Sequence, residues 1–134
     1  MGLEQDVVGV DGWDSVEKDY AEQVEGYYFV NHFAKTDPDK VVQNFITGYQ
    51  EKYNAEPNSF AALGYDTAYI LTEAIKAAGS TDSQAILDKL VETEHKGVTG
   101  NIRFDKKGDV SQKDITIIQL KDGKHELLEK IVVE

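Results

Sequence analysis

The sequence predicts an α/β fold in which about three main helices pack on a mixed sheet that ends in a β-hairpin. Three observations support this prediction: short apolar runs near both ends, consecutive helical patterns in the middle, and a two-residue turn signal near the C-terminus. With 134 residues, 40% of them hydrophobic and 29% charged, the chain is long enough to bury the core of one domain.

The N-terminal part is typical of two strands joined by a crossover. Val7–Val10 is apolar and too short for a helix, so we expect a buried strand there. Gly26–Phe33 is rich in aromatic and β-branched residues, which predicts a second strand. The segment 15–25 between them is weakly amphipathic and has the length of a crossover. The two strands are therefore expected to be parallel.

A first helix is predicted from the segment that follows. Asp37 is the expected N-cap, and Pro38 takes the first helical position, where its missing N–H is harmless. Asn54 and Pro57 mark the end of this helix. Its apolar residues recur at helical spacing and form one stripe, which consists of Val41, Val42, Phe45, Ile46 and Tyr49.

Two further helices are expected in succession. Ser59–Ala78 is apolar or small nearly all round in its first turns and stops at Gly79, so we expect neighbouring structure to cover it on more than one side. A third helix is predicted to begin with a capping box formed by Thr81 and Gln84. Its predicted buried stripe consists of Ile86, Leu87, Leu90 and Val91.

The C-terminal part is predicted to be β structure. Residues 100–105 form one expected strand, and residues 114–120 and 124–128 form a pair. Asp122–Gly123 between them is the typical sequence of a type I′ hairpin turn. The helices thus cluster in the middle of the chain and the strands at its ends, which is unusual for one self-contained domain.

Charge and composition exclude several classes of function. Acidic residues outnumber basic ones 25 to 14, giving a net charge of −11, and such a surface repels phosphate backbones, so we expect no nucleic-acid partner. The chain has no cysteine, which excludes disulfides, thiolate chemistry and cysteine-based zinc sites. No apolar run approaches the roughly 20 residues that span a bilayer.

No catalytic or metal-binding pattern is present. His32, His95 and His125 are widely spaced and form no H-E-x-x-H motif. Asp105–Asp109 brackets a glycine with carboxylates but lacks the rest of a calcium loop. No serine lies in a G-x-S-x-G sequence. We therefore expect neither an enzyme nor a bound metal or cofactor.

Asp11 is the first candidate for binding. It follows directly after a predicted parallel strand, and ligands of open α/β sheets gather outside the carboxyl ends of such strands. A carboxylate there can accept charge-assisted hydrogen bonds from an ammonium group. Gly12 permits a sharp turn and a close approach of the backbone to a ligand. The alternative is that Asp11–Gly12 is only a turn.

Three aromatic residues are candidates for the wall of a ligand site. Trp13 offers an apolar surface or a cation–π contact, and packing against its own sheet is the alternative. Phe60 and Tyr65, near the start of the second predicted helix, are candidates for a pocket that holds an apolar side chain. For both, ordinary core packing is the alternative.

Five segments in a fixed order resemble a known family. They are "GVDGWDS", "EGYYFVNHF", "YNAEPNSFAALGYDTAYILTEAIKAAGSTD", "GVTGNIRFDKKGD" and "IIQLKDGK", and together they extend from about Val7 to Leu128. Over this range the chain resembles the C-terminal portion of type I periplasmic (solute) binding proteins of the branched-chain amino acid ABC-transport group.

The resemblance implies a partial fold of that type and a set of ligand contacts. In the family, two α/β lobes close over a ligand. An acid at the position of Asp11 takes the α-ammonium of an amino acid, and an aromatic residue at the position of Phe60 borders its side-chain pocket. Trp13 is added as a neighbour of the acid. Many relatives carry glutamate where this chain has Asp11, and the shorter side chain leaves the exact ligand open.

The resemblance also implies how the chain is divided. Segments 1–33 and 113–134 would belong to one lobe and segment 37–105 to the other, with crossings near Asn31–Lys35 and Asp105–Lys113. Mature family members are longer, and their first part supplies the groups that hold the ligand's carboxylate. We therefore expect the chain to be a fragment that does not bind ligand tightly alone. Such a fragment would expose apolar surface unless it rearranges or self-associates, for example by domain swapping.

The resemblance implies a receptor that delivers an amino acid, branched-chain or similarly apolar, to an ABC permease. The family implies a periplasmic or extracellular location, either free or as a membrane-associated lipoprotein, and the chain itself shows no signal peptide. Two alternatives stay open: a ligand-sensing or interaction domain on the same fold, and a receptor for urea, a short amide or an aromatic acid.

Overall fold

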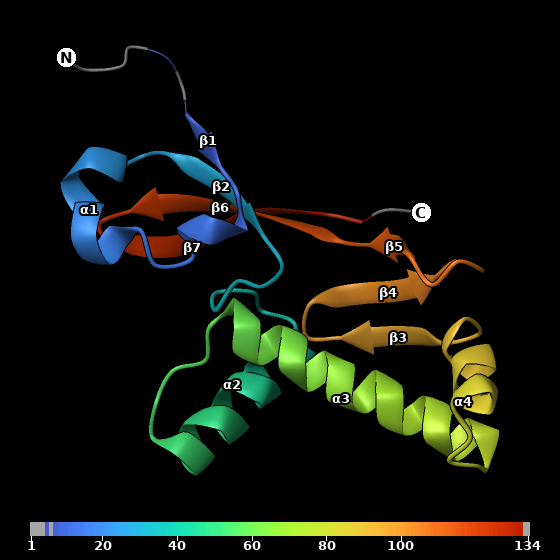
Figure 1. Ribbon diagram of the computed structural model, residues 1–134. Helices are drawn as coiled ribbons and strands as arrows, with labels where there is room; N and C mark the ends of the chain where they lie inside the picture. Colours follow the sequence, from blue (N-terminus) through green and yellow to red (C-terminus); the bar gives the residue numbers. More distant parts are fainter. Residues whose placement is uncertain (1–4, 6, 133–134) are drawn as a thin grey trace.

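A computed structural model describes residues 5 and 7–132, which form two sheets and the helices beside them (Figure 1). The first sheet has the order β1 (Val8–Gly9), β2 (Tyr28–Asn31), β6 (Ile115–Lys121) and β7 (Lys124–Ile131). The second sheet has the order β3 (Glu94–Gly97), β4 (Gly100–Phe104) and β5 (Val110–Lys113). The helices are α1 (Glu17–Val24), α2 (Lys40–Tyr53), α3 (Ser59–Ala78) and α4 (Ser83–Leu90), with a 3-10 helix η1 (Asp11–Trp13) before α1. The predicted α/β class is confirmed.

The parallel pair at the start of the chain is confirmed, but its burial is not. β1 and β2 are parallel, with Gly9 opposite Phe29, so these two residues share a face of the first sheet. That face packs against α1. Val8 and Val10 lie on the other face and are 67% and 62% exposed. The expectation of a buried strand is therefore wrong, because β1 is the edge strand and nothing in the described chain covers its outer face.

The C-terminal hairpin forms as predicted. β6 and β7 are antiparallel, and both residues of the turn have positive φ, 51° at Asp122 and 67° at Gly123, as a type I′ turn requires. The Glu25 carboxylate accepts hydrogen bonds from the backbone N–H groups of both turn residues, at 2.9 and 3.4 Å. The loop after α1 thereby holds the end of the hairpin.

The N-cap of α2 is Asp39, so the prediction of Asp37 is wrong. The Asp39 carboxylate accepts a hydrogen bond of 2.9 Å from the backbone N–H of Val41, and this bond lowers the pKa of Asp39. Asp37 instead accepts from the Asp39 N–H and from Lys130 Nζ, each at 2.9 Å. The predicted end of the helix is confirmed, because Asn54 is its C-cap in the left-handed region.

The bounds of α3 match the prediction, with Gly79 as a left-handed C-cap. Its expected cover is incomplete: one face of α3 has no neighbour in the described chain. The exposed large side chains on it are Phe60, Leu71 and Ile75. The N-cap of α4 is Asp82, which accepts from the Ala85 N–H at 3.0 Å, so the capping box is wrong. Gln84 contacts Asp88 instead, and Leu87 is 47% exposed rather than buried.

Two separate apolar clusters stabilise the described chain. One lies between the first sheet and α1 and contains Val24, Phe29, Ala34, Ile118 and Leu120. The other joins α2, α3 and the β3–β4 turn and contains Phe33, Val42, Phe45, Ala62 and Val98. The chain passes from the first sheet to α2 after Asn31 and returns from the second sheet at Asp114.

These passages lie at or next to the predicted crossings, 31–35 and 105–113. The division into lobes (1–33 and 113–134 against 37–105) stays a prediction, and residues 1–4, 6 and 133–134 of it lie outside the described residues. Across the described chain, no helix has the length and apolar character that crossing a bilayer requires.

Candidate ligand-binding site

Asp11 lies at the carboxyl end of β1, where the sequence places it. It is the first residue of η1, its side chain is 62% exposed, and it borders a hollow of about 280 Å³ at the end of the first sheet. The hollow combines apolar and charged side chains. Its lining consists of Val10, Asp11, Val30, Asn31, His32, Lys113, Asp114 and Ile115.

Two basic groups share this hollow with Asp11. His32 Nε2 lies 3.6 Å from Asp11 Oδ2, and Lys113 Nζ donates a hydrogen bond of 3.0 Å to Thr99 Oγ1. Burial lowers the pKa of His32, and the charge of Lys113 lowers it further, while Asp11 and Asp14 raise it. Burial also lowers the pKa of Lys113. Because the pKa of His32 is lowered below 6.5, most of its imidazole is neutral at pH 7 and is not a cationic partner for the Asp11 carboxylate.

Replacing Asp11 with asparagine is expected to lower the pKa of His32 further, because it removes the acid that favours the imidazolium. A histidine whose folded-state pKa lies below 6.5 takes up its proton first in the unfolded chain. As the pH falls from 6.5 to the folded-state pKa of His32, protonation of the unfolded chain lowers the free energy of unfolding. This pH window is wider in Asp11→Asn. NMR titration of the His32 ring measures the shift. His125, which pairs with Glu17, is the internal control, and an unchanged or raised His32 pKa would contradict the expectation.

Gly12 and Trp13 follow Asp11 in η1 but lie differently. Gly12 has open space where a Cβ would be, so a ligand can approach its backbone. Trp13 stacks on Tyr27 with ring centroids 6.5 Å apart, and a Cβ at Gly9 would overlap its ring. Trp13 thus packs on the first sheet and does not line the hollow beside Asp11. Its contact with a ligand stays a prediction.

Phe60 is 77% exposed in the first turn of α3. The structure joins this turn to the loop that carries Asp11, because Ser59 donates two hydrogen bonds to Asp14 Oδ2, from its backbone N at 3.1 Å and from Oγ at 2.8 Å. Tyr65, the other aromatic candidate, lies on a different face of α3. Its ring packs on that of Phe45, with the ring centroids 4.9 Å apart. The hydrogen bond between the Tyr65 and Tyr69 hydroxyls raises the pKa of Tyr65 to about 12.

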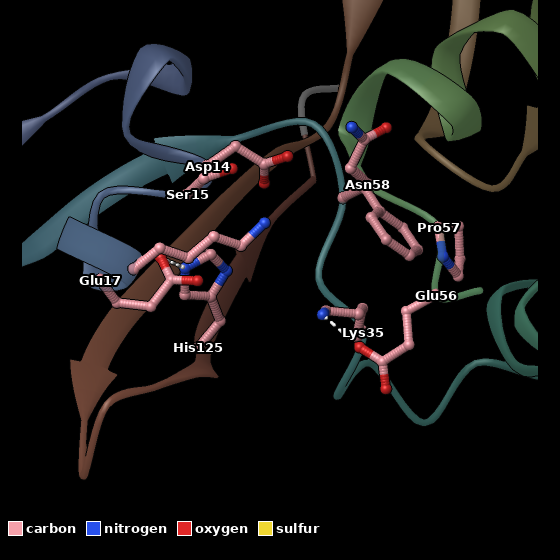
Figure 2. A pocket seen from close by; sticks show the side chains of 10 residues that line it. Asp14, Ser15, Glu17, Lys35, Glu56, Pro57, Asn58 and His125 are labelled. Atoms are coloured by element: carbon pink, nitrogen blue, oxygen red, sulfur yellow. Dashed lines mark hydrogen bonds and ion pairs between the residues drawn. The ribbon is translucent and has the colours of Figure 1, made fainter. Parts of the chain in front are cut away.

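Asp14 itself was not identified from the sequence. Its partners lie 17 and 45 positions away, and a single sequence carries no signal for such contacts. Asp14 also borders a second, more polar hollow of about 220 Å³ (Figure 2). Two polar contacts face each other across it: His125 Nε2 with the Glu17 carboxylate at 2.9 Å, and the Lys35–Glu56 ion pair at 2.6 Å. In the described part of the chain, no cluster of three or more acidic or histidine side chains is arranged to hold a metal ion.

Comparison with known proteins places these residues in context. The family described as "Periplasmic binding protein" matches residues 1–124. The leucine-binding protein LivK from Thermotoga maritima is 31% identical with a TM-score of 0.84, over 97% of this chain and 38% of that one. LivJ from Streptococcus pneumoniae, solved in complex with isoleucine, is 32% identical with a TM-score of 0.79, over 99% of this chain and 38% of that one.

A more distant solved structure shares the fold alone. It is a solute-binding protein from R. palustris in complex with benzoate, 20% identical with a TM-score of 0.74, over 89% of this chain and 33% of that one. The present chain therefore spans about 38% of the length of the leucine- and isoleucine-binding structures.

Proposed function

The chain belongs to the periplasmic binding protein family, and from this premise we propose that it is part of the solute-binding component of an ABC transporter for amino acids with apolar side chains. The observation that carries the proposal is the position of Asp11. Its exposed carboxylate lies at the carboxyl end of a parallel strand and borders a largely apolar hollow. Such a site suits a ligand that has an ammonium group next to an apolar side chain.

In the proposed mechanism, two lobes close around the ligand. Asp11 accepts hydrogen bonds from the ammonium, Gly12 lets the backbone come close, and Phe60 contacts the apolar side chain. Trp13 supports the loop from the side of the sheet. The groups that hold the ligand's carboxylate belong to the part of the fold that this chain does not include. Closure removes water from the Asp11 carboxylate and thereby strengthens its contact with the ammonium.

The ligands named for related structures support an amino acid. Leucine and isoleucine belong to relatives that are about 30% identical, and benzoate to one that is 20% identical. The benzoate complex makes an aromatic acid the second candidate. A ligand without an ammonium group leaves the charge of Asp11 without a partner, and this difference separates the two candidates.

Replacing Asp11 with asparagine in the longer polypeptide that contains this segment is expected to weaken leucine binding by about 30-fold or more, because it removes the charge that pairs with the ammonium. Isothermal titration calorimetry with leucine, isoleucine and benzoate measures the effect. Asp19→Asn, on the exposed side of α1, is the matched control and should leave all affinities unchanged. If Asp11→Asn keeps the affinity for leucine, Asp11 does not bind the ammonium.

We further propose that this chain is a segment of a longer receptor that acts outside the cytoplasm and docks on an ABC permease. The proposal rests on the 38% coverage of the relatives and on the uncovered apolar faces of the first sheet and α3. A complete fold would cover these faces. In its absence a second copy of the chain can take that place.

The segment alone is accordingly expected to self-associate and to bind leucine more weakly than micromolar. Light scattering over a range of concentrations measures the first property, and calorimetry on residues 1–134 the second. Val10→Glu and Ile75→Glu together introduce charges on the two exposed faces and should reduce the association. A strictly monomeric chain, or a micromolar dissociation constant for leucine, would contradict the proposal.

A further inference from the structure

We propose that Asp14 is a positioning residue of the ligand site, because its carboxylate fixes the loop that carries Asp11 to the helix end that carries Phe60. This inference rests on the proposed function for its meaning, but its structural part can be tested without any ligand. Asp14 does not line the hollow beside Asp11. It acts through Ser59 and through the turn of η1.

The Asp14 carboxylate collects three donors from two distant parts of the chain. Oδ2 accepts from the backbone N and from Oγ of Ser59, at 3.1 and 2.8 Å, and Oδ1 accepts from Asn31 Nδ2 at 2.5 Å. Ser59 and Asn31 are 3% and 4% exposed, so the donors of these bonds are shielded from solvent. A half-buried carboxylate with three donors is held in one orientation.

The contact with Ser59 also uses the end of α3. Ser59 is the first residue of the helix, where backbone N–H groups have no partner within the helix. Asn58, the N-cap, accepts from the Ala61 N–H at 3.0 Å, and Asp14 takes the N–H of Ser59. A negative charge at this end is favoured by the helix dipole. Asp14 thus completes the cap of a helix that lies 45 residues away in the sequence.

The path from Asp14 to each ligand contact is short and rigid. On one side, the Asp14 N–H donates to the carbonyl of Asp11 at 3.1 Å, and the Trp13 N–H donates to Val10 at 2.9 Å, so residues 10–14 form one closed turn. On the other side, Phe60 follows Ser59 directly in the helix. A displacement of Asp14 therefore changes the separation of Asp11 and Phe60.

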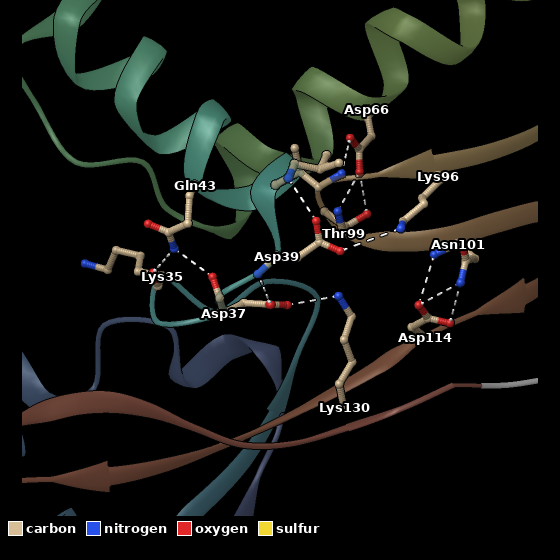
Figure 3. A network of polar contacts seen from close by, with 12 residues as sticks. Lys35, Asp37, Asp39, Gln43, Asp66, Lys96, Thr99, Asn101, Asp114 and Lys130 are labelled. Carbon is tan, nitrogen blue, oxygen red and sulfur yellow. Dashed lines mark hydrogen bonds and ion pairs between the residues drawn. The ribbon is translucent and has the colours of Figure 1, made fainter.

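Two further contacts join the first sheet to the helical segment at a different place. Lys130 Nζ contacts Asp37 Oδ2 at 2.9 Å (Figure 3), and the backbone N–H of Leu127 donates to Thr36 Oγ1 at 2.9 Å. Both join β7 to the segment before α2. They hold the first sheet near α2 but do not reach the first turn of α3. The Asp14–Ser59 contact therefore restrains a different part of the molecule.

The absence of cysteine allows a direct test of this restraint. Cysteines at Lys18 in α1 and Thr67 in α3, both exposed, carry nitroxide labels whose separation is measured by pulsed electron resonance. The otherwise unchanged chain, studied at dilution, should give one narrow distance distribution. Asp14→Ala should broaden and shift it, and Ser59→Ala, which removes only the hydroxyl donor, should do so to a smaller extent.

Controls keep this test decisive. Asp19→Ala removes an exposed acid from α1 and should leave the distribution unchanged. Circular dichroism reports whether each variant is folded, and if Asp14→Ala is not, Ser59→Ala carries the test. An unchanged distribution in a folded Asp14→Ala variant, or in Ser59→Ala where the former is unfolded, overturns the positioning role.

A binding measurement then distinguishes the positioning role of Asp14 from the proposed binding of an amino acid. In the longer polypeptide, Asp14→Ala should weaken leucine binding by about tenfold, mainly through faster dissociation, with Asp11 and Phe60 intact. Asp14→Glu, which keeps the charge, should recover part of the loss. If Asp11→Asn abolishes binding while Asp14→Ala has no effect, the positioning role is wrong and the proposed function stands. If labels move in Asp14→Ala but neither variant changes leucine affinity, the proposed function is wrong.

Discussion

Replacing Asp66 with alanine is expected to lower the free energy of unfolding by about 3–5 kcal/mol. Asp66, on α3, is 1% exposed, and its carboxylate accepts from the Val98 N–H at 2.8 Å and from the Thr99 N–H and hydroxyl at 2.7 and 2.8 Å (Figure 3). A Cβ at Gly97 would overlap this carboxylate, so the β3–β4 turn lies directly against it. Alanine leaves two buried backbone N–H groups without partners.

Urea denaturation followed by circular dichroism measures this loss. Asp66→Asn keeps the size of the side chain and one acceptor oxygen, so it should cost less than alanine. Asp88→Ala removes an exposed acid from α4 and should change the free energy of unfolding by about 0.5 kcal/mol or less. A loss below about 1 kcal/mol in Asp66→Ala would show that water or another group satisfies the β3–β4 turn.

Replacing Phe29 with alanine is expected to cost a similar amount, about 3–5 kcal/mol, for a different reason. Phe29 on β2 is 0% exposed and belongs to the cluster between the first sheet and α1. Its ring packs edge-to-face with the His125 ring, with the ring centroids 5.0 Å apart. Removing it takes away buried apolar area and leaves a cavity in a close-packed site.

The fluorescence of Trp13, which packs on the same cluster, follows the unfolding of this part of the chain. Val8→Ala, on the exposed face of the neighbouring strand, is the matched control and should cost about 0.5 kcal/mol or less. If Phe29→Ala is no more destabilising than Val8→Ala, the first sheet does not contribute to the stability of the chain in solution.

Local signals in the sequence were sufficient for several elements. The end of α3 follows from Gly79, and the hairpin follows from Asp122–Gly123. Neither depends on contacts far along the chain. β3 and β5 were not predicted, because "EHKG" and "VSQK" lack an apolar alternation. These two strands exist because β4 pairs with both.

The error at the start of α2 and the omission of Asp14 have a common physical cause. Pro38 favours Asp37 as the N-cap by sequence, but the Asp37 carboxylate contacts Lys130, 93 positions away, and Asp39 caps the helix. For the site, the sequence identified Asp11 and Phe60 but not Asp14, whose partners are distant. Single-sequence patterns report on neighbours within a few residues, whereas tertiary hydrogen bonds decide the rest.

The register of the first sheet fixes the order in which a ribosome can complete this structure. β2 pairs with β6, so Asn31 meets Thr116 only after the whole segment from α2 to β5 has been synthesised. The segment from α2 to β5 can already pack while the nascent chain still grows, because its partners are close in sequence. Until β6 has been synthesised, β2 can pair only with the two-residue strand β1, so its other edge and the Phe29 side chain lack their later partners.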